Sequence, residues 1–136
     1  MNAFAHLETP LDEAPRFFVE PRDKLAMSEL DRVKRFRVLF RKHFPGARIV
    51  AIPNGQVRSM AELNRARSEG ASWGFPDIIA IGNGLHWAAL EWKSGTGQIK
   101  DHQVQWLNWL HDRGHLCGVF RKPETAIAWL LERGFR

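Results

Sequence analysis

The first sustained pattern of hydrophobic positions runs over residues 28–44. At 100° per residue, five apolar side chains fall within an arc about 120° wide, which is typical of an amphipathic helix. These five residues are Leu30, Val33, Phe36, Phe40 and Phe44. Glu29 projects into the middle of the arc, whereas Asp31 points away from it. The pattern predicts a helix that begins after Ser28 and ends at Pro45.

Downstream, short extended runs alternate with helical patterns. The expected strands are 47–52, 77–81, 85–93 and 116–120, and the expected further helices are 59–69, 99–113 and 123–132. Glycine and asparagine at 82–84 favour a tight hairpin between the second and third strands. A hairpin followed by a helical crossover to another strand predicts an α/β fold, in which helices flank a mixed central β-sheet in the order αβαββαβα.

The residues before the first helix show no sustained period and contain Pro10, Pro15 and Pro21. We therefore expect residues 1–24 to form an irregular N-terminal arm and residues 25–136 to form a single domain. The total length of 136 residues suits one hydrophobic core.

Composition excludes several classes of protein. The chain has a single cysteine, Cys117, so no internal disulfide can form. No apolar run approaches the ~20 residues that span a bilayer. Acidic residues, among them Glu8 and Asp12, stand where a signal peptide would carry positive charge. We expect a cytoplasmic protein.

The charge balance is basic: 20 Lys and Arg face 15 Asp and Glu, a net charge of +5. Such a balance suits a polyanionic partner, a nucleic acid or an acidic membrane surface. A soluble protein that is merely basic would show the same total.

Asp77, Glu91 and Lys93 surround the expected hairpin. Because side chains alternate along a strand, Glu91 and Lys93 share one face. A three-residue loop, 82–84, sets Asp77 opposite Ala89, so that Glu91 lies diagonally across from Asp77 on the same face. A two-residue loop would turn Asp77 to the other face. The chemistry therefore depends on the register of the hairpin.

Two carboxylates brought together repel each other unless a cation lies between them. Oxygen ligands suit Mg²⁺ or Mn²⁺, and a neighbouring lysine can orient water or neutralise charge on a phosphate. The arrangement is consistent with metal-assisted hydrolysis of a phosphodiester. The Glu-x-Lys spacing is common by itself, and it also occurs as a charge pair on edge strands.

The stretch from Gly74 to Phe120 resembles the core of the VRR-NUC family within the PD-(D/E)XK nucleases, which have a restriction-endonuclease-like fold. The resemblance is carried by Gly74-Phe75-Pro76-Asp77, the hairpin, Glu91-Trp92-Lys93 and a following helix with Gln103. It implies an Mg²⁺- or Mn²⁺-dependent endonuclease that acts on DNA, often branched or flapped. For stand-alone bacterial or phage members it implies a homodimer that resembles a Holliday-junction resolvase, with no membrane partner. It also implies a location in the cytoplasm of a bacterial or phage-infected cell.

By the same resemblance, Asp77 and Glu91 would bind the metal together with the main-chain carbonyl of Trp92, and Lys93 would be the catalytic lysine. Gln103 would complete the site, although an amide bonded to backbone would have the same pattern. The family also places an acid on the first helix. Glu29 fits this role better than Asp31 because it faces the sheet, where it could reach the metal through water. The helix dipole alone would also favour a glutamate there.

Further basic and aromatic residues could contact nucleic acid, or simply lie on solvated faces. They are Arg35, Arg58, Arg65, Arg67, Trp73 and Lys100. The alternatives to a junction-selective enzyme are a flap or single-strand nuclease, a restriction-type endonuclease, and a DNA-binding module of the same fold without catalysis.

Overall fold

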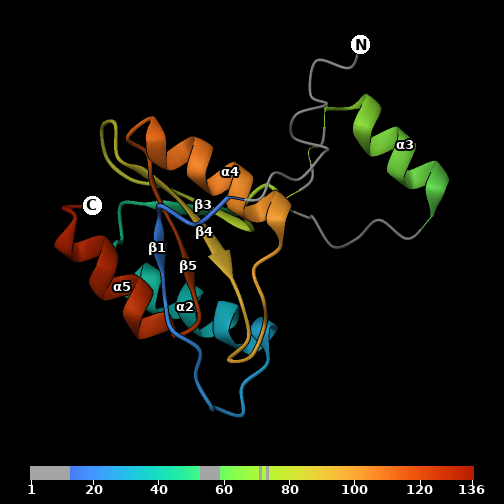
Figure 1. Ribbon diagram of the computed structural model, residues 1–136. Helices are drawn as coiled ribbons and strands as arrows, with labels where there is room; N and C mark the ends of the chain where they lie inside the picture. Colours follow the sequence, from blue (N-terminus) through green and yellow to red (C-terminus); the bar gives the residue numbers. More distant parts are fainter. Residues whose placement is uncertain (1–12, 53–58, 71, 73) are drawn as a thin grey trace.

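The computed structural model describes residues 13–52, 59–70, 72 and 74–136. Its strands form one five-stranded sheet in the order β1-β5-β4-β3-β2 (Figure 1). The strands are β1 (Phe18–Val19), β2 (Arg48–Ala51), β3 (Ile78–Ile81), β4 (Trp87–Trp92) and β5 (Leu116–Phe120). The helices are α2 (Glu29–His43), α3 (Met60–Ser68), α4 (Asp101–Asp112) and α5 (Pro123–Glu132). β1 and β4 run parallel to β5, whereas β2 and β4 run antiparallel to β3. The expected mixed α/β architecture is confirmed.

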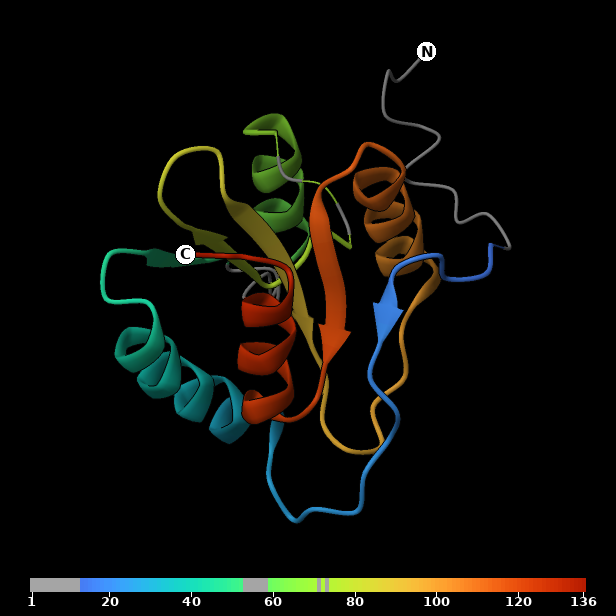
Figure 2. The ribbon, with the colours of Figure 1, turned by 90° about the vertical axis from the view of Figure 1, so that its left-hand side faces the viewer.

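Helices cover both faces of the sheet (Figure 2). On one face, α2 and α5 bury an aromatic core that includes Phe36, Phe40 and Trp92. On the other face, α4 packs Val104 and Leu107 against the sheet. α3 stands apart from the sheet (Figure 1), and none of its residues is buried. In the described part of the chain, no helix is both long and apolar enough to cross a bilayer.

Residues 13–24, the described part of the expected arm, are more ordered than their prolines suggest. Within the expected irregular arm, Phe18 and Val19 form β1 and pair with Gly118 and Val119 of β5. Phe18 also lies 5.5 Å from the ring of Phe120. From Glu29 onward, the elements follow the expected order. The prolines interrupt the segment, but burial of its aromatic residues fixes β1 at the edge of the sheet.

The hairpin between β3 and β4 has a different register from the one expected. Ile81 pairs with Trp87, so the loop spans residues 82–86 rather than 82–84. The Gly82 N–H donates to the His86 carbonyl at 2.7 Å, which closes the longer loop. The shift of the pairing is two residues, an even number, so Glu91 remains on the face that was expected.

Helix α2 begins and ends close to the expected residues, but its buried face is rotated. The Ser28 Oγ accepts from the Asp31 N–H at 3.1 Å, as a capping serine should. Leu30, expected in the apolar arc, is 62% exposed, and Arg32 is fully buried. Arg32 precedes Phe36 and Phe40 at four-residue spacing, so it lies on the same side of the helix.

Candidate active site

Asp77 and Glu91 come together because all of β3 pairs with β4 and both residues lie just beyond the last pair, Ile78 with Leu90. Asp77 immediately precedes β3, and continuing the ladder sets it directly opposite Glu91. The Asp77 N–H donates to Glu91 Oε2 at 3.2 Å. The Trp92 N–H donates to Asp77 Oδ2 at 2.9 Å. The two carboxylates are therefore closer partners than the expected diagonal arrangement would have made them.

Lys93 and Gln103 both approach the same oxygen of Glu91. The Lys93 Nζ lies 3.8 Å from Glu91 Oε1. Gln103, in the first turn of α4, donates from Nε2 to that oxygen at 2.7 Å. The Gln103 Oε1 also accepts the Lys100 N–H at 2.9 Å, so this side chain caps α4 while it holds the glutamate. Gln103 thus bonds to both backbone and Glu91, and its role in an active site stays a prediction.

The Gly74–Asp77 segment explains why α4 begins beside the carboxylates. Gly74 has φ +77°, and a Cβ there would lie 2.5 Å from the main-chain carbon of His102. Only glycine permits this approach of the two backbones. Phe75 then packs edge-on against Trp106, with ring centroids 5.0 Å apart. These contacts fix the first turn of α4, and Gln103 with it.

Burial and mutual repulsion perturb the acids. Glu91 is 2% exposed. Its burial, followed by the negative charge of Asp77, raises its pKa to about 9, although Lys93 acts in the opposite direction. Burial also raises the pKa of Asp77, against the hydrogen bond from the Trp92 N–H. The fold thus holds a carboxylate pair that favours retention of a proton when no cation is near.

Glu29 belongs to this electrostatic cluster. It is the first residue of α2, at the rim of the site, and its side chain remains exposed. Partial desolvation raises its pKa, Asp77 raises it further, and Lys93 lowers it. Asp31 lies in the same helical turn and is also exposed. Asp77 and Lys93 therefore act electrostatically on Glu29, whose role as the acid of the first helix stays a prediction.

The donor set suits a small divalent cation. Asp77 and Glu91 offer carboxylate oxygens at the ends of two adjacent strands, where hard ions such as Mg²⁺ bind. Their pKa values are raised chiefly by burial, and a bound cation would relieve this penalty. Over the described residues, no group of three or more His, Cys, Asp and Glu side chains is placed to hold a metal. The site would therefore rest on two carboxylates, main-chain oxygen and water.

A buried arginine fixes the loop between Lys93 and α4. Arg121 is 3% exposed, and its Nη1 donates to the carbonyls of Ser94 at 2.6 Å and Gly97 at 2.9 Å. Its Nε donates to the Glu20 carbonyl at 3.1 Å. The Glu20 carboxylate in turn accepts the main-chain N–H of Arg121. Arg121 therefore joins the loop that follows Lys93 to the N-terminal segment.

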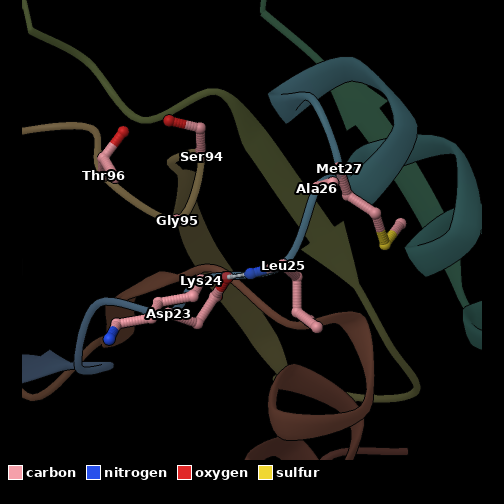
Figure 3. Close-up of a pocket in the computed structure, with 8 residues that line it drawn as sticks. All are labelled: Asp23, Lys24, Leu25, Ala26, Met27, Ser94, Gly95 and Thr96. Atoms are coloured by element: carbon pink, nitrogen blue, oxygen red, sulfur yellow. Dashed lines mark hydrogen bonds between the residues drawn. The ribbon is translucent and has the colours of Figure 1, made fainter.

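A second buried arginine, Arg32, connects α2 to the N-terminal segment and to Arg121. Arg32 forms a bidentate ion pair with Asp23, in which Nη1 donates to Oδ2 at 2.7 Å and Nη2 donates to Oδ1 at 2.8 Å. The Arg32 Nη1 also donates to the Arg121 carbonyl at 2.8 Å. The backbone of Asp23 lies against the 94–96 loop, and the two segments line a hollow of about 300 Å³ (Figure 3). The Leu25 N–H donates to Asp23 Oδ1 at 3.0 Å, and both residues line this hollow.

Sequence reasoning missed these supporting residues. The four-residue spacing from Arg32 to Phe36 and Phe40 was an available signal of its burial. No comparable signal marks Arg121 or Glu20, because their partners are backbone atoms far away in sequence.

The expected nucleic-acid contacts are dispersed. Arg35 on α2 is exposed and pairs with Glu124 at 2.6 Å. Arg65 on α3 pairs with Glu69 at 3.0 Å. Arg67 on α3 and Lys100 at the start of α4 are also exposed. Arg58 and Trp73 lie outside the described residues.

No protein-family model matches the sequence, and no curated protein matches it significantly. Among solved structures, the fold is similar to one described as a VRR_NUC domain, with a TM-score of 0.55 and 18% sequence identity. The alignment covers 80% of this chain and 100% of that one. At this identity the likeness shows the fold alone, which is consistent with the expected restriction-endonuclease-like core.

Proposed function

We propose that the protein is a metal-dependent DNA endonuclease of the VRR-NUC type within the PD-(D/E)XK nucleases. The observation that supports this best is that Lys93 and Gln103 both contact Glu91 Oε1. The Asp77 N–H donates to the other oxygen of the same carboxylate, Oε2. Burial of these charged groups costs folding free energy. Phosphodiester hydrolysis would use each of them. The similarity of fold to a VRR_NUC domain agrees with the proposal.

In this proposal, Asp77 and Glu91 hold Mg²⁺ or Mn²⁺ together with the carbonyl of Trp92, and Glu29 contributes through water. The bound ion supplies Lewis acidity toward the phosphate and a nucleophilic water. Lys93 positions that water and neutralises charge that develops on the phosphate oxygens. Gln103 keeps Glu91 Oε1 oriented through its 2.7 Å hydrogen bond.

The proposed substrate is DNA, consistent with a net charge of +5. Selectivity for branched DNA and action as a homodimer follow from the resemblance, because paired cuts across a four-way junction call for two symmetric sites. Flap or single-strand cleavage, restriction-type cleavage and binding without catalysis are the alternatives. Of these, binding without catalysis is the least favoured, because Asp77, Glu91 and Lys93 all lie in contact.

The test is cleavage of labelled single-stranded, duplex, flap and four-way-junction DNA in Mg²⁺, Mn²⁺ or EDTA. Lys93→Ala should abolish cutting, whereas Lys122→Ala, which removes an exposed lysine, should not. Sedimentation of the protein with and without junction DNA would test for the dimer. Metal-independent cutting, or cutting that persists in Lys93→Ala, would contradict the proposal. Binding without cutting would favour the non-catalytic module.

A further inference from the structure

A hollow between the second half of α2 and β2 is surrounded by three arginines. Its volume is about 290 Å³, and Arg37, Arg41 and Arg48 line it above an apolar floor that includes Phe40 and Ile49. Arg37 and Arg41 are one helical turn apart, and Arg48 begins the neighbouring strand. All three arginines are exposed.

In the described part of the chain, these three arginines have no acidic partner. None of the three forms an ion pair or side-chain hydrogen bond with the described residues, whereas Arg16 and Arg65 each contact a carboxylate. Guanidinium groups around one hollow repel each other, and an anion between them would relieve that repulsion. The helix dipole would favour Arg41 in the last turn of α2, but it does not account for Arg48 on the strand.

The hollow and Glu29 of the candidate active site lie at opposite ends of α2, and β2, which Arg48 begins, pairs with β3 beside Asp77. Along α2, Arg37 and Arg41 are about 12–18 Å from Glu29, at ~1.5 Å per residue. Along the sheet, the Ile52 N–H bonds to the Asp77 carbonyl, and Arg48 lies about 13 Å away at ~3.3 Å per residue. A DNA strand advances ~3.4 Å per nucleotide along the duplex axis, so these spacings correspond to about four or five nucleotides.

We propose that Arg37, Arg41 and Arg48 form a phosphate-binding site that holds the nucleic-acid backbone about four or five nucleotides from the bond that is cut. This inference rests on the proposed function for its geometry. Its ligand class is the phosphodiester backbone, so the site would add affinity and orientation without reading sequence. The site differs from the expected contacts at Arg35 and Arg65, whose charges are already paired.

The test compares two triple variants that each remove three positive charges. Arg37→Gln/Arg41→Gln/Arg48→Gln empties the proposed site. Arg16→Gln/Arg113→Gln/Arg133→Gln removes arginines that contact Asp112, Trp109 and Trp129 respectively. Binding of labelled duplex DNA would be measured by anisotropy in metal-free buffer between roughly 50 and 200 mM salt, a range over which phosphate contacts weaken steeply. Circular dichroism would check folding, and Arg41→Gln/Arg48→Gln serves as a milder second variant.

The site variant should bind DNA at least tenfold more weakly at low salt. Its plot of log K against log [salt] should lose about 2.7 in slope, because each phosphate contact contributes ~0.9. The control should lose less than a third of that slope. Equal losses in both triple variants, or unchanged binding in the site variant, would overturn the site. The binding assay contains no metal and is therefore independent of cleavage. If the protein does not cut DNA but its binding still depends on these arginines, the nuclease proposal fails and the phosphate-binding site stands.

Discussion

The buried pair between Arg32 and Asp23 allows a quantitative test of how the fold holds the site. The Arg32 side chain is 0% exposed and that of Asp23 is 7% exposed. The change Asp23→Asn keeps the size and shape of the side chain but removes its charge. The buried guanidinium would then lose its ion-pair partner, although the carbonyls of Met27 and Arg121 would still accept its hydrogen bonds.

Removing one partner of a buried ion pair costs about 3–5 kcal/mol. Because the carbonyls still accept hydrogen bonds from Arg32, we expect the free energy of unfolding to fall by about 3 kcal/mol. This is a substantial part of the ~5–15 kcal/mol that stabilises a typical domain. The exposed pair of Arg35 and Glu124 provides the control, because its side chains are 58% and 57% exposed. Glu124→Gln should therefore change the free energy of unfolding by less than ~1 kcal/mol.

Urea unfolding at pH 7, followed by tryptophan fluorescence and circular dichroism, gives both free energies. A lower midpoint with an unchanged slope would show that Asp23→Asn changes stability and not the denatured state. If Asp23→Asn and Glu124→Gln both lose less than about 1 kcal/mol, the pair does not act as a buried charge and the reasoning fails.

Three further predictions follow from the contacts of the site. Gly74→Ala should lower the free energy of unfolding by about 1–3 kcal/mol in urea titrations, because φ is +77° and the new Cβ would meet the His102 backbone; an unchanged midpoint would contradict this. Gln103→Ala should reduce metal-dependent cleavage about 10–100-fold, whereas exposed Gln98→Ala should leave it unchanged. Hydrogen bonding to Arg32 lowers the pKa of Asp23 to about 2. The stabilisation by ionised Asp23 should thus be complete above pH ~4, the pKa of an unfolded aspartate, and should disappear as the pH falls through 2. The difference in free energy of unfolding between the wild type and Asp23→Asn should therefore vanish at low pH.

The sequence predicts well whatever depends on neighbouring residues. Ser28 and Ser59 cap their helices with hydrogen bonds to main-chain N–H groups at 3.1 and 3.2 Å. Alternation along the strand places Glu91 and Lys93 on one face, and the Lys93 Nζ lies 3.8 Å from Glu91 Oε1. These features need only backbone periodicity and local hydrogen bonding.

Features that depend on distant partners were harder to predict. The hairpin loop extends to five residues, and the Asn83 N–H within it donates to the carbonyl of Arg136, which is distant in sequence. β1 forms because a parallel partner, β5, lies about 100 residues away. Arg121 is buried because main-chain carbonyls of the 94–97 loop accept its guanidinium. None of these partnerships leaves a periodic trace in the sequence.

The charges at the candidate site limit what can bind there. If Asp77, Glu91 and Glu29 are all ionised and Lys93 is protonated, the cluster has a formal charge of −2, which the raised pKa values oppose. One divalent cation would neutralise it. A second would leave an excess of +2, which the single negative charge of a phosphodiester would only half offset. The electrostatics of the resting site therefore favour one tightly held ion, so a second ion would bind only together with substrate. Calorimetric titration of the DNA-free protein with Mn²⁺ should give one site, lost in Glu91→Gln, and two equivalent sites would refute this reasoning.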